Sequence, residues 1–426
     1  MIKNLEKYFD RLWPINRSIT GPGFRESLDI LSEIIPMERM FFKTGQKVFD
    51  WVVPKEWTIR DAYFIDPKGK KHAEFSKNNL HIMGYSTLFK GTISFDEFKK
   101  HIYTIPHMPE AIPYVTSYYN EKWGFCISQN EFDTLSDGEY QVYIDSDLFD
   151  GTLEIGEAVI PGNTDKEILF STYLCHPSLA NNELSGPLVM AFLYQRLVKM
   201  HSRKYTYRFV MLPETIGSIC YLSKRGKHLS KYLIAGYIMS CLGDTGNFTY
   251  KKSRQENSLG DKAAQIVLKS TKNKYSIISF NPADGSDERQ FCSPGFNLPV
   301  GSLMRTIYGM YPEYHTSLDN KDIISFKALE ESVEIYYLIV KALEWNKKLI
   351  SNIQYCEPHL GSRGLYPSVT NSYTWKDDFS AIKWILNYSD GKNDLFNIAE
   401  KSGCRIDTLL KAAQKLLNAD LIKEVA

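Results

Sequence analysis

One stretch of the chain, residues 167–186, constrains the fold more than any other. An apolar run, Glu-Ile-Leu-Phe-Ser-Thr-Tyr-Leu-Cys-His, ends on His176 and enters a polar loop, Pro-Ser-Leu-Ala-Asn-Asn-Glu-Leu-Ser-Gly, which opens a helix. A buried strand followed by a loop and a helix is typical of α/β proteins, which keep their sites at the carboxyl ends of strands. The sequence therefore predicts His176 at the carboxyl edge of a sheet.

Three further residues of metal-binding type occupy comparable positions downstream. Glu214 and Asp244 each follow an apolar run closely, and His315 lies in the polar segment 313–320. A single histidine at a strand end means little, but four such residues in one domain indicate a metal site. No GxGxxG, Walker A, GxSxG or HExxH motif occurs, which argues against nucleotide-binding and serine-hydrolase classes.

Composition and charge narrow the class of protein. A chain of 426 residues suits two or three domains, and a net charge of +1 gives no overall attraction to nucleic acid or acidic membranes. The N-terminus lacks the apolar core of a signal peptide, and no stretch approaches the roughly 20 apolar residues that span a bilayer. The seven cysteines are scattered without CxxC spacing, as is typical of reduced, buried thiols. We therefore expect a cytoplasmic protein with no membrane partner.

Four regions follow one another along the chain. Residues 1–45 show the helical spacing of apolar side chains, and residues 46–150 change to short β-like runs between turn residues. Residues 151–350 alternate strand and helix patterns, and residues 370–426 contain short helices and a final strand. We expect N-terminal helices, a β-rich insertion domain, a main α/β domain and a small C-terminal module. The strands expected in the insertion are Val48–Val53, Trp57–Ile65, Thr92–Phe95, Tyr114–Tyr119 and Tyr140–Ile144.

The C-terminal module has the pattern of a winged helix, because a helix and a helix-turn-helix precede a strand. Its expected elements are helices around Ala381–Leu386, Leu395–Ala399 and Thr408–Leu417 and a strand at Leu421–Val425. The expected recognition helix and its approach carry only three basic residues, which are Arg405, Lys411 and Lys415. Because so few basic residues bind phosphates poorly, we expect packing or dimerisation into a homo-oligomer, with nucleic-acid binding as the alternative.

The order of the motifs resembles that of zinc aminopeptidases of the glutamate-carboxypeptidase and transferrin-receptor type. The similarity is closer still to a bacterial branch, the aminopeptidase-like proteins associated with polysaccharide biosynthesis, which carry a β insertion and a C-terminal winged helix. It covers nearly the whole chain, and its most specific segments are 175–187 and 213–218. The resemblance implies an α/β, mixed-sheet domain of the zinc-aminopeptidase-like (phosphorylase/hydrolase-type) fold with these two additions. The motifs that carry it are His176, Asn181–Gly186, Glu214, Asp244, Ser286-Asp287 and Tyr314-His315-Thr316.

The same resemblance implies a ligand set for zinc. His176 and Asp244 would hold one ion, while Glu214 and His315 would hold a second. Tyr314 is similar to a family tyrosine that donates a hydrogen bond to the tetrahedral intermediate. A catalytic zinc takes about three nitrogen or oxygen ligands and lowers the pKa of a bound water to roughly 7.

Two positions depart from the family pattern. The aspartate that normally bridges the two ions is Asn182 here, and the family's second glutamate is replaced by Thr215 after Glu214. A neutral amide bridges two cations poorly, because it brings no charge to offset their repulsion. Three arrangements stay open: one zinc with Glu214 free as a base, two ions, or an inactive relic. In the second arrangement the missing carboxylate would come from Glu183, Asp287 or Glu288.

We therefore expect a zinc-dependent amide or peptide hydrolase of aminopeptidase type. Metal-activated water would attack the carbonyl of a peptide or a small amide-containing substrate. Glu214 and Glu183 are the candidate carboxylates for proton transfer, and Tyr314 would stabilise the oxyanion. Arg289 and Arg305 could clamp a substrate carboxylate, although ordinary ion pairing is the simpler expectation. The alternative is a non-catalytic binding or regulatory protein built on a degenerate aminopeptidase fold with a winged helix.

Overall fold

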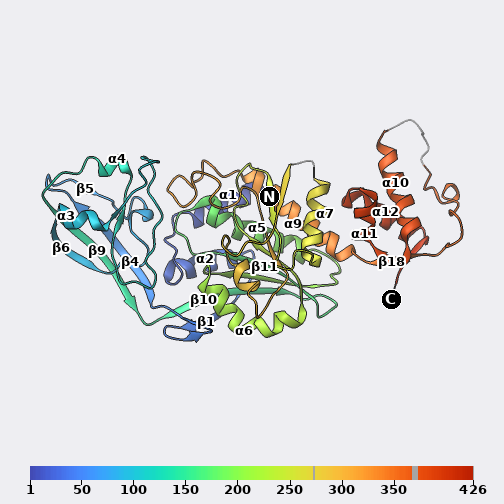
Figure 1. The fold of residues 1–426 in the computed structure, drawn as a ribbon, viewed down its shortest axis with the longest axis horizontal. Coiled ribbons are helices and arrows are strands. Elements are labelled where there is room, and N and C mark those ends of the chain that lie inside the picture. Colours follow the sequence, from blue (N-terminus) through green and yellow to red (C-terminus); the bar gives the residue numbers. More distant parts are fainter. Residues whose placement is uncertain (272–273, 367–372, 426) are drawn as a thin grey trace.

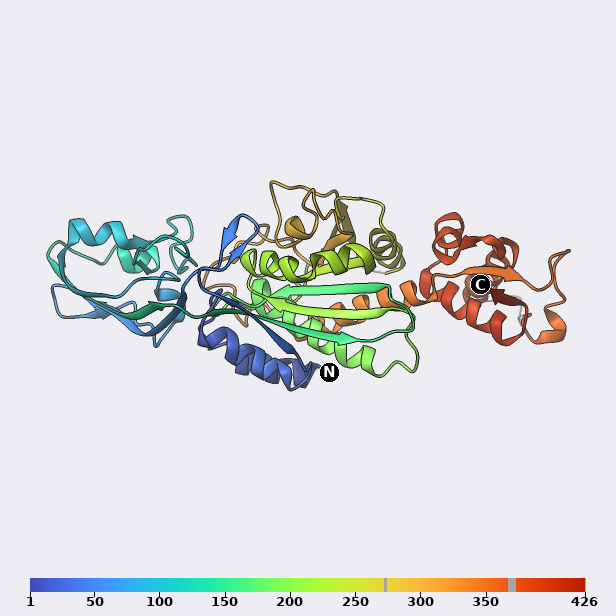
Figure 2. The same cartoon turned by 90° about the horizontal axis from the view of Figure 1, so that it is seen from below.

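The computed structural model describes residues 1–271, 274–366 and 373–425. Three bodies lie in a row: the insertion, a central α/β body and the C-terminal module, at the left, centre and right of Figure 1. The view from below shows the same order (Figure 2). Within the described ranges, none of the helices combines the length and apolar character needed to cross a bilayer.

The central body is built on an eight-stranded mixed sheet, as the sequence predicts. Strands β12, β11, β13 and β16 run parallel at its centre, and β1, β10 and β14 each pair antiparallel with a neighbour. The strands in spatial order are β1 (Glu38–Lys43), β10 (Thr152–Ile160), β12 (Thr206–Leu212), β11 (Glu167–Tyr173), β13 (Leu233–Met239), β16 (Val300–Met304), β14 (Phe248–Lys251) and β15 (Tyr275–Ile278).

Helices cover both faces of this sheet, because successive side chains on its central strands point alternately into two apolar cores. On β11, Ile168 and Phe170 pack into the core formed with one group of helices, whereas Leu169 belongs to the other core. The first group comprises α1 (Ile2–Leu12), α2 (Pro22–Ser32), α5 (Ser185–Val198), α7 (Leu259–Ser270) and α9 (Phe326–Trp345). The opposite core receives α6 (Ile216–Tyr232) and continues into the insertion.

The N-terminal region contains a strand that the sequence analysis missed. Residues 1–45 were expected to be helical, but 38–43 form β1, which pairs with β10 at the edge of the sheet. Pro36 separates this strand from α2, because a proline lacks the N–H that a helix needs and disfavours helical geometry in the residue before it. The edge pairing, set by a partner more than 100 residues away, overrides the local pattern.

The insertion is built on a four-stranded antiparallel sheet with the order β5-β4-β9-β6. Its strands are β4 (Glu56–Ile65), β5 (Lys71–His72), β6 (Phe89–Ser94) and β9 (Glu139–Phe149). Beside them lie the pairs β2 (Lys47–Val48) with β3 (Trp51–Val52) and β7 (Ile102–Tyr103) with β8 (Phe125–Cys126), and the short helices α3 (Phe95–Phe98) and α4 (Gln129–Phe132). The expected strand Tyr114–Tyr119 is instead a loop that makes isolated bridges at Pro113 and Thr116.

The C-terminal module has the helices expected from its sequence. They are α10 (Tyr373–Tyr388), α11 (Leu395–Ser402) and α12 (Ile406–Asn418), and the strands β17 (Lys348–Ser351), β18 (Asp390–Asp394) and β19 (Ile422–Glu424) form a small sheet. The first residues of the expected module, 370–372, lie outside the described ranges. Two of the basic residues near α12 already have acidic partners, since Arg405 pairs with Asp407 and Lys415 with Asp378.

Candidate active site

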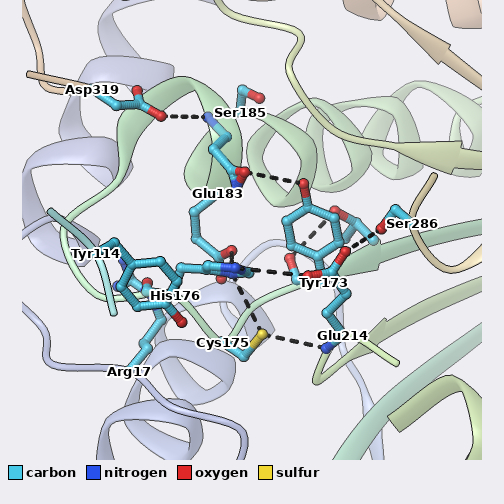
Figure 3. A network of polar contacts seen from close by, with 12 residues as sticks. Arg17, Tyr114, Tyr173, Cys175, His176, Glu183, Ser185, Glu214, Ser286 and Asp319 are labelled. Carbon is cyan, nitrogen blue, oxygen red and sulfur yellow. Dashed lines mark hydrogen bonds and ion pairs between the residues drawn. The ribbon is translucent and has the colours of Figure 1, made fainter. Parts of the chain in front are cut away.

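His176 follows β11 at the carboxyl edge of the sheet, as predicted. Its Nδ1 lies 2.6 Å from Oε2 of Glu183, and Sγ of Cys175 lies 3.5 Å from the same nitrogen (Figure 3). Glu183 comes from the π-helical turn Ala180–Leu184 that precedes α5. Gly186 allows α5 to approach the sheet, because a Cβ there would lie 2.2 Å from the Met239 carbonyl oxygen. The Glu183 carboxylate therefore orients the ring and leaves Nε2 facing the other way.

Glu214 lies on that other side of the ring. Its Oε2 is 3.7 Å from Nε2 of His176, and its Oε1 accepts a hydrogen bond from Oγ of Ser286. The backbone N–H of Glu214 donates to Sγ of Cys175, which ties the ends of β11 and β12 together. The side chain is 29% exposed, whereas His176 and Glu183 are buried, so Glu214 is the member of this group that solvent reaches.

His315 lies beside the same pair, although it is far away in the sequence. Its ring centroid is 5.4 Å from that of His176, and Tyr314 stacks on it at 3.9 Å. Burial and, to a smaller extent, the neighbouring His176 lower the pKa of His315 to about 3, so the ring is neutral at ordinary pH. Its Nε2 is buried without a hydrogen-bond partner. A neutral imidazole with a free nitrogen is the form that binds a metal.

Asn181 connects the turn that carries Asn182 and Glu183 to Asp244. The Asn181 side chain donates to Oδ2 of Asp244, and the other Asp244 oxygen accepts from Oγ1 of Thr306 and the N–H of Gly246. Asn182 receives a long contact of 3.5 Å from the Tyr173 hydroxyl, and its Nδ2 is buried without a partner. Protein donors thus engage both oxygens of Asp244, and its role as a metal ligand stays a prediction.

Asp287 is the second carboxylate on the Glu214 side of the site. It accepts hydrogen bonds from the N–H of Thr215 and from Oγ of Ser218, while its Oδ2 has no partner. Burial and, to a smaller extent, the charge of Glu214 raise the pKa of Asp287 to about 8. Asp287 thereby anchors the backbone at Thr215, the position where the family pattern has its second glutamate. Thr215 has a φ of 63°, which costs free energy in a residue other than glycine.

The other charged candidates have structural partners. Glu288 forms a buried ion pair with Lys251 at 3.0 Å. Arg305 is buried and donates to Glu331 and to backbone carbonyls, and Arg289 donates to the Ser286 carbonyl oxygen. The guanidinium of Arg305 is therefore not free to clamp a substrate, and ordinary pairing is its role.

Sequence reasoning missed residues that distant segments bring to the site. Arg17 is buried and donates from Nε to the His176 carbonyl oxygen at 2.9 Å. Burial lowers its pKa to about 10, against the opposing effect of the Glu183 charge, so it remains a cation at neutral pH. Asp319 accepts from the backbone N–H groups of the turn that carries Glu183. No local pattern marks these contacts, because the partners are more than 100 residues apart.

The group around His176 contains residue types that bind zinc, and the metal number stays a prediction. Two unpartnered buried atoms with lone pairs belong to residues that contact His176, namely Oε1 of Glu183 and Nε2 of His315. Such atoms are rare in proteins unless a ligand or water pairs with them. Two imidazoles and a carboxylate are a common zinc set, and 3.7 Å between Nε2 of His176 and Oε2 of Glu214 suits two ligands with bonds of about 2 Å.

One tighter group of ligand-type residues exists in the described ranges, formed by Cys175, His176 and Glu183 within 4.8 Å. It is a weaker candidate. Burial raises the pKa of the Cys175 thiol to about 11, so the thiol of the metal-free protein keeps its proton at neutral pH and a metal would have to displace it. The short contact between His176 and Glu183 is also that of the hydrogen bond which commonly orients a metal-binding histidine.

Comparison with known proteins agrees with this architecture. A 416-residue match at 45% identity, spanning 98% of this chain and 95% of the relative, links it to a Clostridium acetobutylicum protein provisionally named a polysaccharide biosynthesis protein with an aminopeptidase-like domain. A crystal structure of a C. acetobutylicum protein, provisionally described as a peptidase, superposes with a TM-score of 0.93 at 43% identity, covering 100% of this chain and 96% of that one.

More distant structures share the fold alone. A zinc aminopeptidase from Bacillus subtilis has a TM-score of 0.58 at 12% identity and covers 80% of this chain and 93% of its own. A peptidase M28 precursor from Shewanella amazonensis has a TM-score of 0.56 at 12% identity, with 80% and 92% coverage. The expected aminopeptidase-like fold is thus confirmed. Residues 348–424 match the winged helix-turn-helix model, which confirms the C-terminal winged helix. Residues 6–346 match the domain of unknown function DUF4910, and the chain belongs to that family.

Proposed function

We propose that this protein is an amide hydrolase of aminopeptidase type that uses one zinc ion held at the carboxyl edge of the central sheet. The observation that supports the proposal most is the pairing around His176. Its Nδ1 contacts Glu183, and its Nε2 faces Glu214 at 3.7 Å. His176 and His315 would hold the ion, with Glu214 either as a third ligand or as the base.

The bound ion would polarise the substrate carbonyl and lower the pKa of the attacking water. With the ion bound, Glu183 would accept the Nδ1 proton of His176, and Nε2 would be the nitrogen that faces the ion. Glu214 is partly exposed and has one oxygen fixed by Ser286, which leaves Oε2 to take a proton from water and return it to the leaving amine. Tyr314 stacks on His315, where its hydroxyl could reach the developing oxyanion.

The substrate would be a peptide or a small molecule with an amide bond. The C. acetobutylicum relative is named for polysaccharide biosynthesis, and an amide on a sugar precursor is therefore one class to include in a substrate panel. All seven cysteines are free, which fits the expectation of a reducing, cytoplasmic setting.

A second candidate, a non-catalytic binding protein, has one observation in its favour. The positions where the family pattern places a bridging aspartate and a second glutamate hold Asn182 and Thr215. The winged helix would then be the functional module, acting on nucleic acid or on another protein.

Metal content and hydrolysis measured together separate the two candidates. Purified full-length protein should retain about one zinc after dialysis, and His176→Ala should lose it. Glu214→Gln should lower kcat by about 10²–10⁴ on a responsive aminoacyl or N-acyl amide, as expected for a lost proton carrier. If the variant keeps its zinc, Glu214 is the base and not a ligand. Glu110→Gln, at an exposed position, is the matched control. A wild-type protein without zinc, and without turnover on the panel, would refute the proposal.

A further inference from the structure

The insertion domain reaches the candidate active site through one loop, residues 112–118. The loop lies along the segment that carries His315 and is held there by backbone contacts. The N–H of Tyr114 donates to the His315 carbonyl oxygen at 2.9 Å, and the N–H of Ser317 donates to the Ile112 carbonyl oxygen at 2.8 Å. The backbone around Pro113 and Thr316 forms an antiparallel bridge. His315 itself has a φ of 57°, a conformation that costs free energy in a non-glycine residue and needs support from its surroundings.

Tyr114 also covers both imidazoles with its ring. Its centroid lies 4.9 Å from that of His176 and 5.2 Å from that of His315, the second in an edge-to-face arrangement. Figure 3 shows the Tyr114 ring beside His176, across from Arg17. Aromatic pairs at these distances contribute about 0.5–1.5 kcal/mol beyond the area they bury. One side chain from the insertion therefore contacts two residues that lie 139 positions apart in the sequence.

The far end of the Tyr114 ring is fixed as well. Its hydroxyl lies 3.0 Å from that of Tyr118, and the Tyr118 ring packs edge-on against Tyr85 within the insertion. Tyr118 has a φ of 40°, so the loop and the facing segment that carries His315 each contain one strained residue. The ring is thus clamped between the insertion and the two histidines.

We propose that Tyr114 is a positioning residue of the active site, which holds the His176 and His315 rings side by side so that both can bind the same ion. The inference rests on the proposed zinc site and assigns the insertion a part in it. The aromatic ring of Tyr114 contacts the two imidazoles and holds them in place, and its hydroxyl anchors that ring through Tyr118.

Two substitutions at Tyr114 separate the role of the ring from that of the hydroxyl. Tyr114→Phe keeps the ring and its contacts with both imidazoles, and we expect its zinc affinity to stay within about threefold of wild type. Tyr114→Ala removes the ring, and we expect zinc to bind about 10–100-fold more weakly, the loss seen when groups that orient metal ligands are removed. Affinity is read by competition with a chromophoric chelator, which needs no substrate. Tyr143→Ala removes a tyrosine of the insertion sheet whose ring contacts Tyr63 and Lys90, so it controls for a general loss of stability.

A spectroscopic measurement on the metal-free protein tests the inference without zinc. In protein labelled with ¹³C at histidine, we would measure the nuclear Overhauser effect between ring protons of His176 and His315, assigned by substitution. It should weaken in Tyr114→Ala, because the two imidazoles lose the ring that contacts both of them, and it should stay close to wild type in Tyr114→Phe and Tyr143→Ala. An unchanged Overhauser effect and an unchanged zinc affinity in Tyr114→Ala would overturn the inference. A wild-type protein that binds no zinc would overturn the proposed function, while the Overhauser effect would still report whether Tyr114 positions the two rings.

Discussion

Glu183 offers a direct test of how the site prepares His176 for a metal. The carboxylate is fully buried, and its Oε2 lies 2.6 Å from Nδ1 of the ring. Glu183→Gln keeps the shape of the side chain and an oxygen that can still accept the Nδ1 proton. It removes the negative charge. The perturbation therefore changes the strength of one hydrogen bond and leaves its geometry nearly intact.

The size of the effect follows from that one bond. A hydrogen bond to a charged group contributes about 1.5–3 kcal/mol, and a neutral one about 0.5–1.5 kcal/mol. The difference of about 1–1.5 kcal/mol corresponds to a loss of roughly tenfold in zinc affinity. Substitutions of groups that orient metal-bound histidines cost 10–100-fold, and the estimate lies at the lower end of that range.

Chelator competition on wild type, Glu183→Gln and the exposed control Glu110→Gln would measure the affinity. Chemical denaturation of the zinc-free proteins shows whether the fold has been weakened at the same time, because a loss of affinity should occur without an equal loss of unfolding free energy. Zinc affinity in Glu183→Gln within twofold of wild type would refute the idea that Glu183 prepares the His176 ring for a metal.

Three further predictions concern the scaffold, the metal number and the C-terminal module. Arg208 is buried between Glu157 and Glu167. Arg208→Met should lower the free energy of unfolding by about 3–5 kcal/mol in urea denaturation, because it leaves buried carboxylates unpaired. A loss below about 1 kcal/mol would contradict this prediction. Burial alone would raise the pKa values of Glu157 and Glu167, but Arg208 and neighbouring donors lower them below the usual value for glutamate. The contribution of these two carboxylates to the free energy of unfolding should therefore be fully present above about pH 4.5 and should be lost as the pH falls below that value. Asn182→Asp should raise the zinc content from one equivalent towards two by elemental analysis, and an unchanged content would show that the amide is not what limits the metal number. The full chain should show no salt-dependent binding to duplex DNA in fluorescence anisotropy, because α12 and its approach carry few unpaired basic residues. DNA binding that disappears when residues 348–424 are removed would contradict this prediction.

The sequence was sufficient for the parts of the fold that local patterns determine. The apolar run at 167–175 and the glycine-closed loop after it place His176 correctly, since strand and helix periodicity are local properties. The edge strand β1 and the loop around Tyr114 could not be predicted in this way, because their conformations depend on partners more than 100 residues away. The contacts of Arg17 and Asp319 with the site are hidden for the same reason. Whether Asp244 is a ligand could not be decided by spacing, which shows where a residue lies in the chain but not which neighbours occupy its oxygens.

The way in which the insertion joins the central sheet has a consequence for how such proteins can diversify. Strands β1 and β10 are antiparallel neighbours, and Lys43 lies directly opposite Thr152. The chain therefore leaves and re-enters the sheet at one point, where a simple hairpin would need only a tight turn. A gene can gain, lose or exchange about a hundred residues at such a point without shifting the register of the strands of the central sheet. The insertion can thus vary in size and sequence, provided that the loop at residues 112–118 keeps its contacts with the segment that carries His315.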